Sequence, residues 1–441
     1  MSLMFSVSGL RGVVDKDLTP DIIFRYARIF GVYVKPGKVI IGRDTRRSGK
    51  IFRKAVIAGL HSAGCEVIDL DIVPTPTVLF MVCKLRAKGG IVITASHNPV
   101  RWNALKFISS KGKFLNGREF NVFLKHIAHE KIPISRKKKI DRVRMLSNSV
   151  DDHIDKIIEI LKPDWGKCRV GVDAVNGAGS IGLPRLLEKF GCKVRRLNCT
   201  FSPTFPRKPE PTPENIRGLC QLVKKNKLDL GFATDPDCDR LSIVDENGRA
   251  IGEENTLVLV ADYILSKTKG NVVTNLSTTA LMEYITKKYD CTLYRTKVGE
   301  ANVVSKMESV NAIIGGEGNG GVIYPKLNFT RDTLVGAAII LKLMVERNKK
   351  ISEILATYPK YYIIKKKMRL SRAQFEAKKK KILAKLKGKI NFTDGLRVTA
   401  QDYWLHIRPS QTEPLVRIIG EARDKKLIGK YIRNIQAILK A

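Results

Sequence analysis

The chain has 441 residues, which at about 150 residues per domain predicts roughly three domains and excludes a single small module. Apolar residues make up 44% of it and charged residues 28%, proportions that exclude wholesale disorder. Lys and Arg total 80 against 42 Asp and Glu, a formal net charge of +38, so a polyanionic partner has to be considered.

Three features of the sequence bear on location. No apolar stretch reaches the roughly 18 residues that a membrane-spanning helix needs, and the longest candidate, 334–345, is interrupted by Lys342. The N-terminus lacks the pattern of a signal peptide. The eight cysteines are scattered without a CxxC pair, which favours buried free thiols in a reducing compartment over zinc sites or disulfides. We therefore expect a cytoplasmic protein that does not bind membranes.

Short runs rich in Val and Ile alternate with helical patterns along most of the chain. The candidate strands are 38–44, 65–71, 89–96, 168–175, 228–235, 271–276 and 311–318. This alternation predicts α/β domains with parallel or mixed sheets. Each candidate strand ends in polar or Gly-rich residues, and ligands bind beyond the carboxyl ends of strands in such sheets.

Breaks in this alternation predict domain boundaries. A basic, irregular stretch at 132–144 precedes a predicted helix at 151–161, and a new strand pattern opens at Cys168. The Pro-rich segment 201–215 is expected to be a loop, because each Pro fixes φ and removes a hydrogen-bond donor.

The pattern changes after residue 360. Strands are predicted at 363–370 and 395–409, with a helix at 374–386 between them. We predict three similar α/β domains with mixed sheets (1–150, 151–250 and 251–359) and a smaller C-terminal α+β domain (360–441).

The segment VITASHNP (92–99) is a predicted strand that runs into a small polar loop. Ser96 is expected at the end of the strand, with His97 beside it. A plain turn, in which Ser, Asn and Pro satisfy the backbone, explains this segment equally well.

The segment ATDPDCDR (233–240) contains three alternating aspartates, Asp235, Asp237 and Asp239. An extended backbone would place the three carboxylates on one side, where their repulsion is costly unless a cation compensates it. Oxygen ligands suit Mg²⁺. A calcium-binding EF-hand loop is disfavoured, because Arg240 stands where that loop has Gly. The remaining alternative is three solvated aspartates in a turn.

The segment IIGGEGNGGVIYP (313–325) is rich in glycine. Its glycines allow the backbone to approach a ligand closely, and Glu317 and Asn319 carry groups suited to sugar hydroxyls. A plain Gly-rich turn is equally consistent with it.

The segment HIRPSQTEPLVRI (406–418) offers Arg408, Ser410, Gln411 and Thr412, together with backbone N–H groups, as a cradle for phosphate. Other nucleotide signatures fail: 42–50 has the wrong glycine spacing for a P-loop, and 175–180 does not complete GxGxxG.

In this order, TASHNP, DPDCDR, GGEGNGG and RPSQTEP resemble the phosphoserine, metal, sugar and phosphate loops of the α-D-phosphohexomutase superfamily. The resemblance covers essentially the whole chain and is strongest to the archaeal-type phosphoglucosamine mutase branch. It implies a heart-shaped enzyme of four domains, with one loop from each lining a central cleft.

The resemblance also implies roles for single residues. Ser96 would be the phosphorylated carrier, and Asp235, Asp237 and Asp239 would bind one Mg²⁺ together with the Ser96 phosphate. Arg11, in SGLRG, His97 and Lys106, in WNALK, match positions near the transferring phosphoryl group. The residues implied to contact substrate are Arg240, Lys297, Glu317, Asn319, Arg408, Ser410, Gln411, Thr412 and Arg417. Asn319 and Gln411 depart from the usual residues of their loops, and both keep hydrogen-bonding capacity.

The implied reaction moves phosphate between O1 and O6 of a glucosamine, glucose or mannose phosphate. Phospho-Ser96 would donate, a hexose 1,6-bisphosphate would be intermediate and activator, and Lys106 and His97 are both candidate bases. We expect a monomer or homodimer whose partner is a small sugar phosphate.

Two other functions are disfavoured. A basic nucleic-acid-binding protein on a degenerate mutase scaffold would explain the charge, but the basic runs 136–139, 365–367 and 378–381 are not interleaved with aromatics. A phosphatase with an aspartate nucleophile needs Thr or Val where Asp239 stands.

Overall fold

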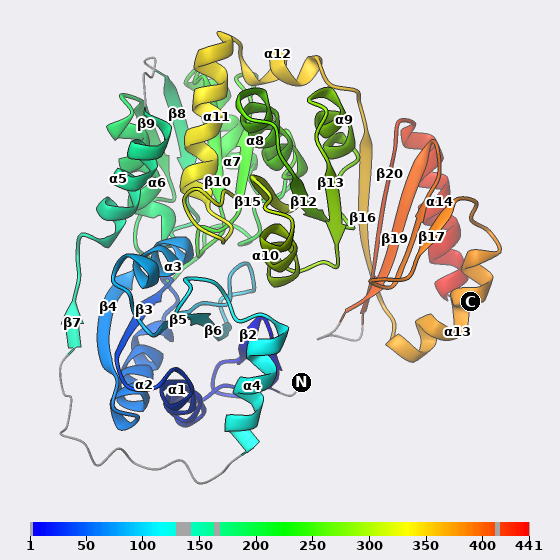
Figure 1. The fold of residues 1–441 in the computed structure, drawn as a ribbon. Helices are drawn as coiled ribbons and strands as arrows, with labels where there is room; N and C mark the ends of the chain where they lie inside the picture. The colour runs from blue at the N-terminus through cyan, green and yellow to red at the C-terminus, as the bar shows by residue number, and fades with distance from the viewer. Residues whose placement is uncertain (1–2, 129–142, 163–167, 411–414, 441) are drawn as a thin grey trace.

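The computed structural model describes residues 3–128, 143–162, 168–410 and 415–440. Four sheets follow one another along the chain (Figure 1). The first three belong to domains that run from blue to yellow in the figure, and the fourth belongs to the C-terminal domain, which stands beside α9 and β13.

The first domain is built on a seven-stranded mixed sheet of order β1-β2-β6-β5-β3-β4-β7. Its strands are β1 (Met4–Ser6), β2 (Gly9–Val13), β3 (Lys38–Arg43), β4 (Glu66–Ile72), β5 (Gly89–Ile93), β6 (Trp102–Ser109) and β7 (Val143–Met145). Its helices are α1 (Pro20–Val34), α2 (Gly49–Ser62), α3 (Thr75–Lys84) and α4 (Gly117–Ala128). Helix α1 begins where the Thr19 side chain accepts from the Ile22 N–H, with Pro20 in the first turn. Strand β5 is entirely buried, because helices cover both faces of the sheet.

The second and third domains each contain a four-stranded mixed sheet. The second has β8 (Arg169–Asp173), β9 (Lys193–Leu197), β10 (Leu230–Thr234) and β11 (Leu241–Val244), with α5 (Ser149–Leu161), α6 (Gly179–Lys189) and α7 (Arg217–Lys225). The third has β12 (Val272–Asn275), β13 (Leu293–Thr296), β14 (Ile314–Glu317) and β15 (Gly321–Ile323), with α8 (Glu254–Lys267), α9 (Leu281–Lys288), α10 (Glu300–Ser309), α11 (Thr333–Arg347) and α12 (Ile351–Ala356).

One topology recurs in these three domains. The strand orders β4-β3-β5-β6, β9-β8-β10-β11 and β13-β12-β14-β15 are equivalent. In each, three strands are parallel and the fourth is antiparallel, so the third and fourth strands form a hairpin at one side. The prediction of three similar α/β domains is confirmed.

The C-terminal domain has a five-stranded antiparallel sheet of order β16-β20-β19-β18-β17. Its elements are β16 (Tyr362–Arg369), α13 (Arg372–Leu383), β17 (Lys389–Asn391), β18 (Leu396–Thr399), β19 (Tyr403–Pro409), β20 (Leu415–Ala422) and α14 (Lys425–Lys440). The single strand predicted at 395–409 is wrong, because the chain turns between Ala400 and Tyr403 and forms the hairpin β18–β19. The helix begins two residues before the predicted start, because Ser371 caps it in a reciprocal pair with Gln374.

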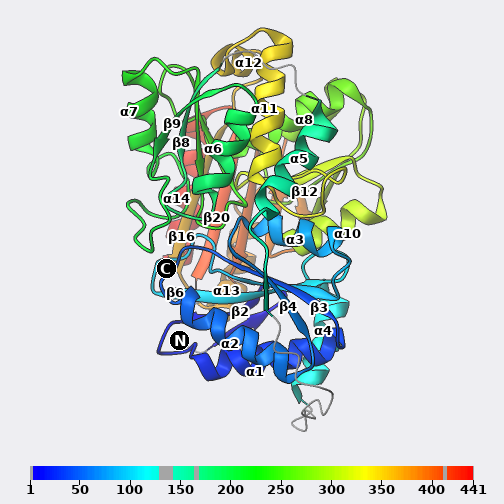
Figure 2. The ribbon, with the colours of Figure 1, turned by 90° about the vertical axis from the view of Figure 1, so that its left-hand side faces the viewer.

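The second and third domains share one apolar core. Helix α11 packs against α5, α6 and α8 (Figure 2), so Leu241 and Phe232 of the second domain join Leu257 and Leu334 of the third in a continuous cluster. The first and C-terminal domains have clusters of their own. Two of the three predicted domains are therefore fused through their interiors.

The cysteines are only in part as predicted. All eight are free, but Cys65, Cys192 and Cys238 alone are buried, while Cys83 is exposed. Within the described residues, no helix combines the length and apolar character needed to span a bilayer.

Candidate active site

The four predicted loops occupy equivalent places in the fold. Each connects two antiparallel strands: β5 to β6, β10 to β11, β14 to β15, and β19 to β20. Contacts described below bring the first three together.

Ser96 lies in the β5–β6 loop, three residues beyond β5 rather than at the strand end as predicted. Its backbone has φ +50°, a left-handed conformation that is uncommon outside glycine and concentrated at functional sites. The Ser96 N–H donates to Thr94 Oγ1 (2.9 Å), and Ser96 Oγ donates to Asp235 Oδ2 (2.9 Å). The serine hydroxyl thus touches the aspartate loop of another domain.

Arg46 holds the Ser96 loop in this conformation. Its side chain is fully buried and forms an ion pair with Asp44 (2.9 Å). Its guanidinium donates at 2.6–3.1 Å to four carbonyl oxygens of the loop, those of Ser96, Asn98, Pro99 and Trp102. The segment 42–50, excluded above as a P-loop, supports the serine instead.

The aspartate loop is a turn, so the extended backbone expected from the alternating pattern is wrong. Cys238 has φ +60°, and Asp235 Oδ1 accepts from the N–H groups of Asp239 (3.1 Å) and Arg240 (3.2 Å). The turn brings one carboxylate oxygen of each of the three aspartates within 4.8 Å of the others.

The donor set fits a divalent cation. Asp237 Oδ2 accepts from Lys106 Nζ (2.7 Å) and Thr75 Oγ1 (3.1 Å), and Asp239 Oδ2 accepts from Arg331 (2.5 Å). The Oδ1 atoms of Asp237 and Asp239 are buried and have no hydrogen-bond partner among the described residues. A buried carboxylate oxygen without a partner is costly, and a bound cation such as Mg²⁺ would satisfy both.

The electrostatics of the aspartates point the same way. Burial and the charges of Asp237 and Asp239 raise the pKa of Asp235 well above its usual range. Burial would raise the pKa of Asp237 too, but hydrogen bonds and the charges of Lys106 and Arg331 together lower this pKa. A cation bound among the three aspartates would favour the ionised form of Asp235.

The sugar loop is packed against the aspartate loop. Glu317 is buried; its Oε1 accepts from Asn275 Nδ2 (2.9 Å) and the Gly299 N–H (3.0 Å). The Gly320 carbonyl accepts from the Leu241 N–H (2.9 Å), directly after the aspartate turn.

Close neighbours within the protein explain the glycines of this loop. A Cβ on Gly320, which has φ +87°, would lie 2.3 Å from the Leu241 carbonyl oxygen, and one on Gly321 would lie 2.2 Å from Arg331 Cδ. The interpretation that these glycines make room for a ligand is therefore corrected. Asn319 Oδ1 accepts from the Gly321 N–H (3.2 Å) and closes the turn.

Arg331 connects the two loops. It is buried, and its guanidinium contacts three carboxylates: those of Asp239 (2.5 Å), Glu317 (3.0 Å) and Glu300 (3.2 Å). Burial would raise the pKa of Glu317, but Arg331 lowers it, so Glu317 is ionised.

Lys106 and His97, the two candidate bases, contact the aspartate loop and the serine, respectively. Burial would lower the pKa of Lys106, but the Asp237 and Asp239 carboxylates raise it. His97 Nδ1 lies 3.4 Å from Ser96 Oγ; burial and nearby arginines lower the pKa of His97 well below its usual range.

The two predicted arginines each have a defined partner. Arg11 donates to Asn98 Oδ1 in the serine loop (2.7 Å). Arg240 donates to Glu210 Oε1 (3.1 Å), in the Pro-rich segment 201–215 that was predicted to be a loop and contains no helix or strand.

The fourth loop begins at a row of cations on the C-terminal sheet. Arg408 of β19 lies directly opposite Arg417 of β20, which lies opposite Lys367 of β16. Like charges in this register repel one another, so the row is suited to an anion. Arg417 is among the charges that lower the pKa of His97 in the serine loop.

Three predicted substrate residues are not joined to this arrangement. Gln411 and Thr412 lie outside the described residues, although the Ser410 N–H donates to the Leu415 carbonyl (2.8 Å) at the base of their loop. Lys297 is exposed, and the structure shows no contact between its ammonium group and the other predicted residues described here.

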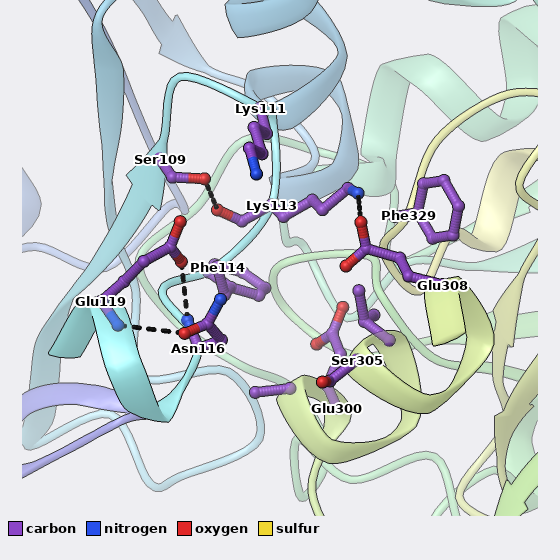
Figure 3. Close-up of a pocket in the computed structure, with 12 residues that line it drawn as sticks. Ser109, Lys111, Lys113, Phe114, Asn116, Glu119, Glu300, Ser305, Glu308 and Phe329 are labelled. Atoms are coloured by element: carbon purple, nitrogen blue, oxygen red, sulfur yellow. Dashed lines mark hydrogen bonds and ion pairs between the residues drawn. The ribbon is translucent and has the colours of Figure 1, made fainter. Parts of the chain in front are cut away.

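A small cavity separates the first and third domains beside the site. Figure 3 shows Lys113 reaching from the first domain to an ion pair with Glu308 of α10, and its ammonium lies 4.0 Å from the centre of the Phe329 ring. The cavity measures about 30 Å³, room for about two water molecules, so it is far too small for a hexose phosphate.

Sequence reasoning missed Thr75, Arg46, Arg331 and Lys367. Each acts on a loop far away in the sequence. Lys367 lies in the basic run 365–367 noted above, but that run did not indicate a role at the site. The nearest signal was the basic segment 42–50, whose Arg46 had no function beyond the failed P-loop match.

Comparisons with known proteins cover the whole arrangement. Family models described as phosphoglucomutase/phosphomannomutase match residues 2–131 (domain I), 151–248 (domain II), 253–361 (domain III) and 367–437 (C-terminal domain). A phosphoglucomutase/phosphomannomutase of Thermococcus kodakarensis is 36% identical, over 98% of this chain and 97% of its own. A phosphoglucosamine/phosphogalactosamine mutase of Sulfurisphaera tokodaii is 32% identical, over 100% and 99%. A crystal structure of a phosphoglucomutase/phosphomannomutase family protein from Burkholderia thailandensis superposes with a TM-score of 0.85 at 26% identity, covering 99% of this chain and 98% of that one.

Proposed function

Because the chain belongs to the phosphoglucomutase/phosphomannomutase family, whose members are phosphohexomutases, we propose that it moves a phosphoryl group between O1 and O6 of a hexose phosphate. The observation that carries this proposal is the contact between Ser96 Oγ and Asp235 Oδ2, inside a set of carboxylates suited to a divalent cation. Ser96 is then the phosphoryl carrier.

In the first half-reaction the free hydroxyl of the bound sugar attacks the phosphorus of phospho-Ser96. The new bond joins the sugar oxygen to phosphorus, the bond from phosphorus to Ser96 Oγ breaks, and Oγ keeps the electron pair. The hydroxyl proton passes to a base beside Ser96, for which Lys106 and His97 are the two candidates. The product is a hexose 1,6-bisphosphate, which turns end for end and returns its other phosphate to Ser96.

Positioning and charge compensation supply most of the catalysis in phosphoryl transfer. A bound Mg²⁺, held by Asp235, Asp237, Asp239 and the phosphorylated Ser96, supplies charge compensation at the transferring group. Arg11 fixes the serine loop through Asn98, and Glu317 accepts hydrogen bonds from sugar hydroxyls.

The distal phosphate binds to the row of Arg408 and Arg417, and Ser410, Gln411 and Thr412 are its further contacts. Asn319, Arg240 and Lys297 complete the sugar contacts. Glucosamine phosphate is the first substrate to test, because several similar proteins are named phosphoglucosamine mutases. Glucose and mannose phosphates follow, because another is named phosphoglucomutase/phosphomannomutase. The domain boundaries at 150, 250 and 360, the cytoplasmic location, the monomeric or dimeric state and the lack of a specific nucleic-acid partner stay predictions.

The test compares the wild-type protein with Ser96→Ala. The wild-type protein should interconvert the 1- and 6-phosphates of at least one of glucosamine, glucose and mannose, and kcat/KM values across the three rank the sugars. Ser96→Ala should abolish turnover while leaving the melting temperature unchanged. Ser62→Ala, on α2, is the control, because its hydroxyl only bonds the Gly59 carbonyl of its own helix.

Two results would overturn the proposal. One is wild-type turnover by Ser96→Ala. The other is an intact mass showing Ser96 always without phosphate in active protein.

A further inference from the structure

The turn between β17 and β18 brings a carboxylate to the cation row. Asp394 Oδ2 lies 3.5 Å from Arg408 Nε, and both side chains are largely buried, with 14% and 15% exposed. A Cβ on Gly395, which has φ +81°, would lie 2.9 Å from Arg408 Cα, so glycine is needed for the turn to lie against this arginine. The His406 ring holds the turn from the other side, since its Nε2 donates to the Asp394 carbonyl (2.5 Å).

The same carboxylate reaches the third domain. Asp394 Oδ2 also accepts from the Val298 N–H (2.9 Å). Val298 lies between Lys297 and Gly299, and the Gly299 N–H donates to Glu317 Oε1 (3.0 Å). One carboxylate thus links the arginine of the phosphate row to the loop that steadies Glu317.

We propose that Asp394 is a positioning residue, the resident counter-ion of Arg408 that the distal phosphate of the substrate must displace. This inference rests on the proposed function, which assigns the distal phosphate to the row. A phosphate dianion and the Asp394 carboxylate need the same guanidinium, and they repel each other when both are near it.

The exchange couples two ends of the substrate. While Asp394 pairs with Arg408, it also anchors the 297–299 loop through Val298. When phosphate pairs with Arg408, the Asp394 carboxylate loses this ion pair and retains its hydrogen bond from the Val298 N–H. The change at Arg408 thereby reaches the backbone next to Lys297 and, through Gly299, Glu317. Asp394 touches neither the sugar nor the reacting atoms.

Asp394→Asn separates the charge of the residue from its hydrogen bond. The amide oxygen still accepts from the Val298 N–H, but the negative charge beside Arg408 is gone. We expect at least tenfold tighter binding of the sugar 6-phosphate, because the repulsion between two unit charges about 4 Å apart already weakens binding about fivefold in bulk water and is larger near a protein surface. The gain should shrink as ionic strength rises.

The experiment is a calorimetric titration in a Ser96→Ala background, which prevents turnover. The ligand is the 6-phosphate of whichever sugar the wild-type enzyme converts best. Asp402→Asn is the matched control. Asp402 is exposed and directly precedes the first residue of β19, whereas Arg408 lies near the last residue of this strand. The substitution removes the same charge and should leave the affinity unchanged.

Asp394→Ala tests the second half of the inference. This variant loses the charge and the Val298 contact together, so in the titration the sugar phosphate should again bind more tightly. In enzyme that retains Ser96, the same substitution should lower kcat. Asp394→Asn should keep kcat within about threefold of wild type, and this split between KM and kcat would not follow from a merely structural role.

The results separate this inference from the proposed function. If Asp394→Asn binds the sugar phosphate no more tightly than Asp402→Asn, or if both Asp394 variants lose affinity, the counter-ion role is refuted while a wild-type mutase activity stands. If the wild-type protein converts none of the three sugar phosphates, the proposed function and this inference fall together.

Discussion

Replacing Arg331 by Met tests how strongly the metal and sugar loops depend on one buried cation. The substitution keeps an unbranched side chain of similar course and removes the charge that faces Asp239, Glu317 and Glu300. Glu317 would retain hydrogen bonds from Asn275 and Gly299, and Glu300 would retain one from Thr330 (2.7 Å). Asp239 Oδ2 would keep only Lys106 at 3.6 Å, so most of the cost falls there.

The expected loss follows from the burial of these groups. Breaking a buried ion pair by removing one partner costs about 3–5 kcal/mol, because the other charge is left uncompensated. In the fused core of the second and third domains, this corresponds to a melting temperature lower by about 10 °C. The assay is thermal unfolding followed by circular dichroism at pH 8 and low salt.

The pH dependence of the stability loss in Arg331→Met provides a second test of the ion-pair argument. Arg331 lowers the pKa of Glu317, so its stabilising contribution is complete well above the unfolded carboxyl pKa and is lost as the pH falls through the folded value. The deficit of Arg331→Met should therefore persist at pH 5 and become smaller at about pH 3.5, below the unfolded carboxyl pKa. Arg185→Met, which breaks an exposed pair with Asp151, is the control and should cost less than about 1 kcal/mol. A melting temperature within about 1 °C of wild type at pH 8, or a larger deficit at about pH 3.5 than at pH 8, would refute the reasoning.

Three further predictions concern other supports of the site. Thr75→Val removes the hydroxyl that donates to Asp237 Oδ2, so the Mg²⁺ concentration giving half-maximal activity should rise about tenfold; an unchanged value would show that Thr75 does not orient the ligand. Arg46→Met leaves four loop carbonyls without their donor and should reduce kcat at least tenfold with little change in KM, whereas unchanged kcat would contradict the support role. Burial lowers the pKa of His406 to about 4, from about 6.5 in an unfolded chain, so the neutral ring stabilises the fold above about pH 6.5 and this contribution is lost on acidification toward pH 4. Between pH 7 and pH 5 the melting temperature of His406→Gln should therefore fall less than that of the wild-type protein. An equal fall in both proteins would count against this assignment.

Local patterns predicted the four loops because each is continuous in sequence and follows a strand. The fold class followed from the alternation of strand and helix patterns, which reports burial on both faces of a sheet. The contacts that hold the loops together could not be predicted in this way. Thr75 and Asp237 are 162 residues apart, and Arg331 and Asp239 are 92 apart, so only the packing of whole domains places them in contact.

The two errors of conformation have the same origin. Alternating aspartates predicted an extended backbone, but hydrogen bonds to Asp235 Oδ1 and the left-handed Cys238 fold the segment into a turn. The segment 395–409 carries apolar residues suited to a strand throughout, and its periodicity does not reveal that the chain reverses after Ala400. A short turn changes few residues, so hydropathy patterns pass over it.

The shared core of the second and third domains fixes the metal loop and the sugar loop relative to each other, but it does not include the C-terminal domain. Separating the metal loop from the sugar loop would expose the interior around α8 and α11, whereas the C-terminal domain meets the third domain through polar contacts at Ser277, Thr279, Val298 and the pair Lys365–Glu254. Polar interfaces between domains permit relative motion, so the C-terminal domain is freer to rotate than the second and third domains are to separate. Such a rotation would change the distance between Ser96 and Arg408. Under the proposed function, such a rotation would let one fixed serine serve sugars that present their distal phosphate on O1 in one half of the reaction and on O6 in the other.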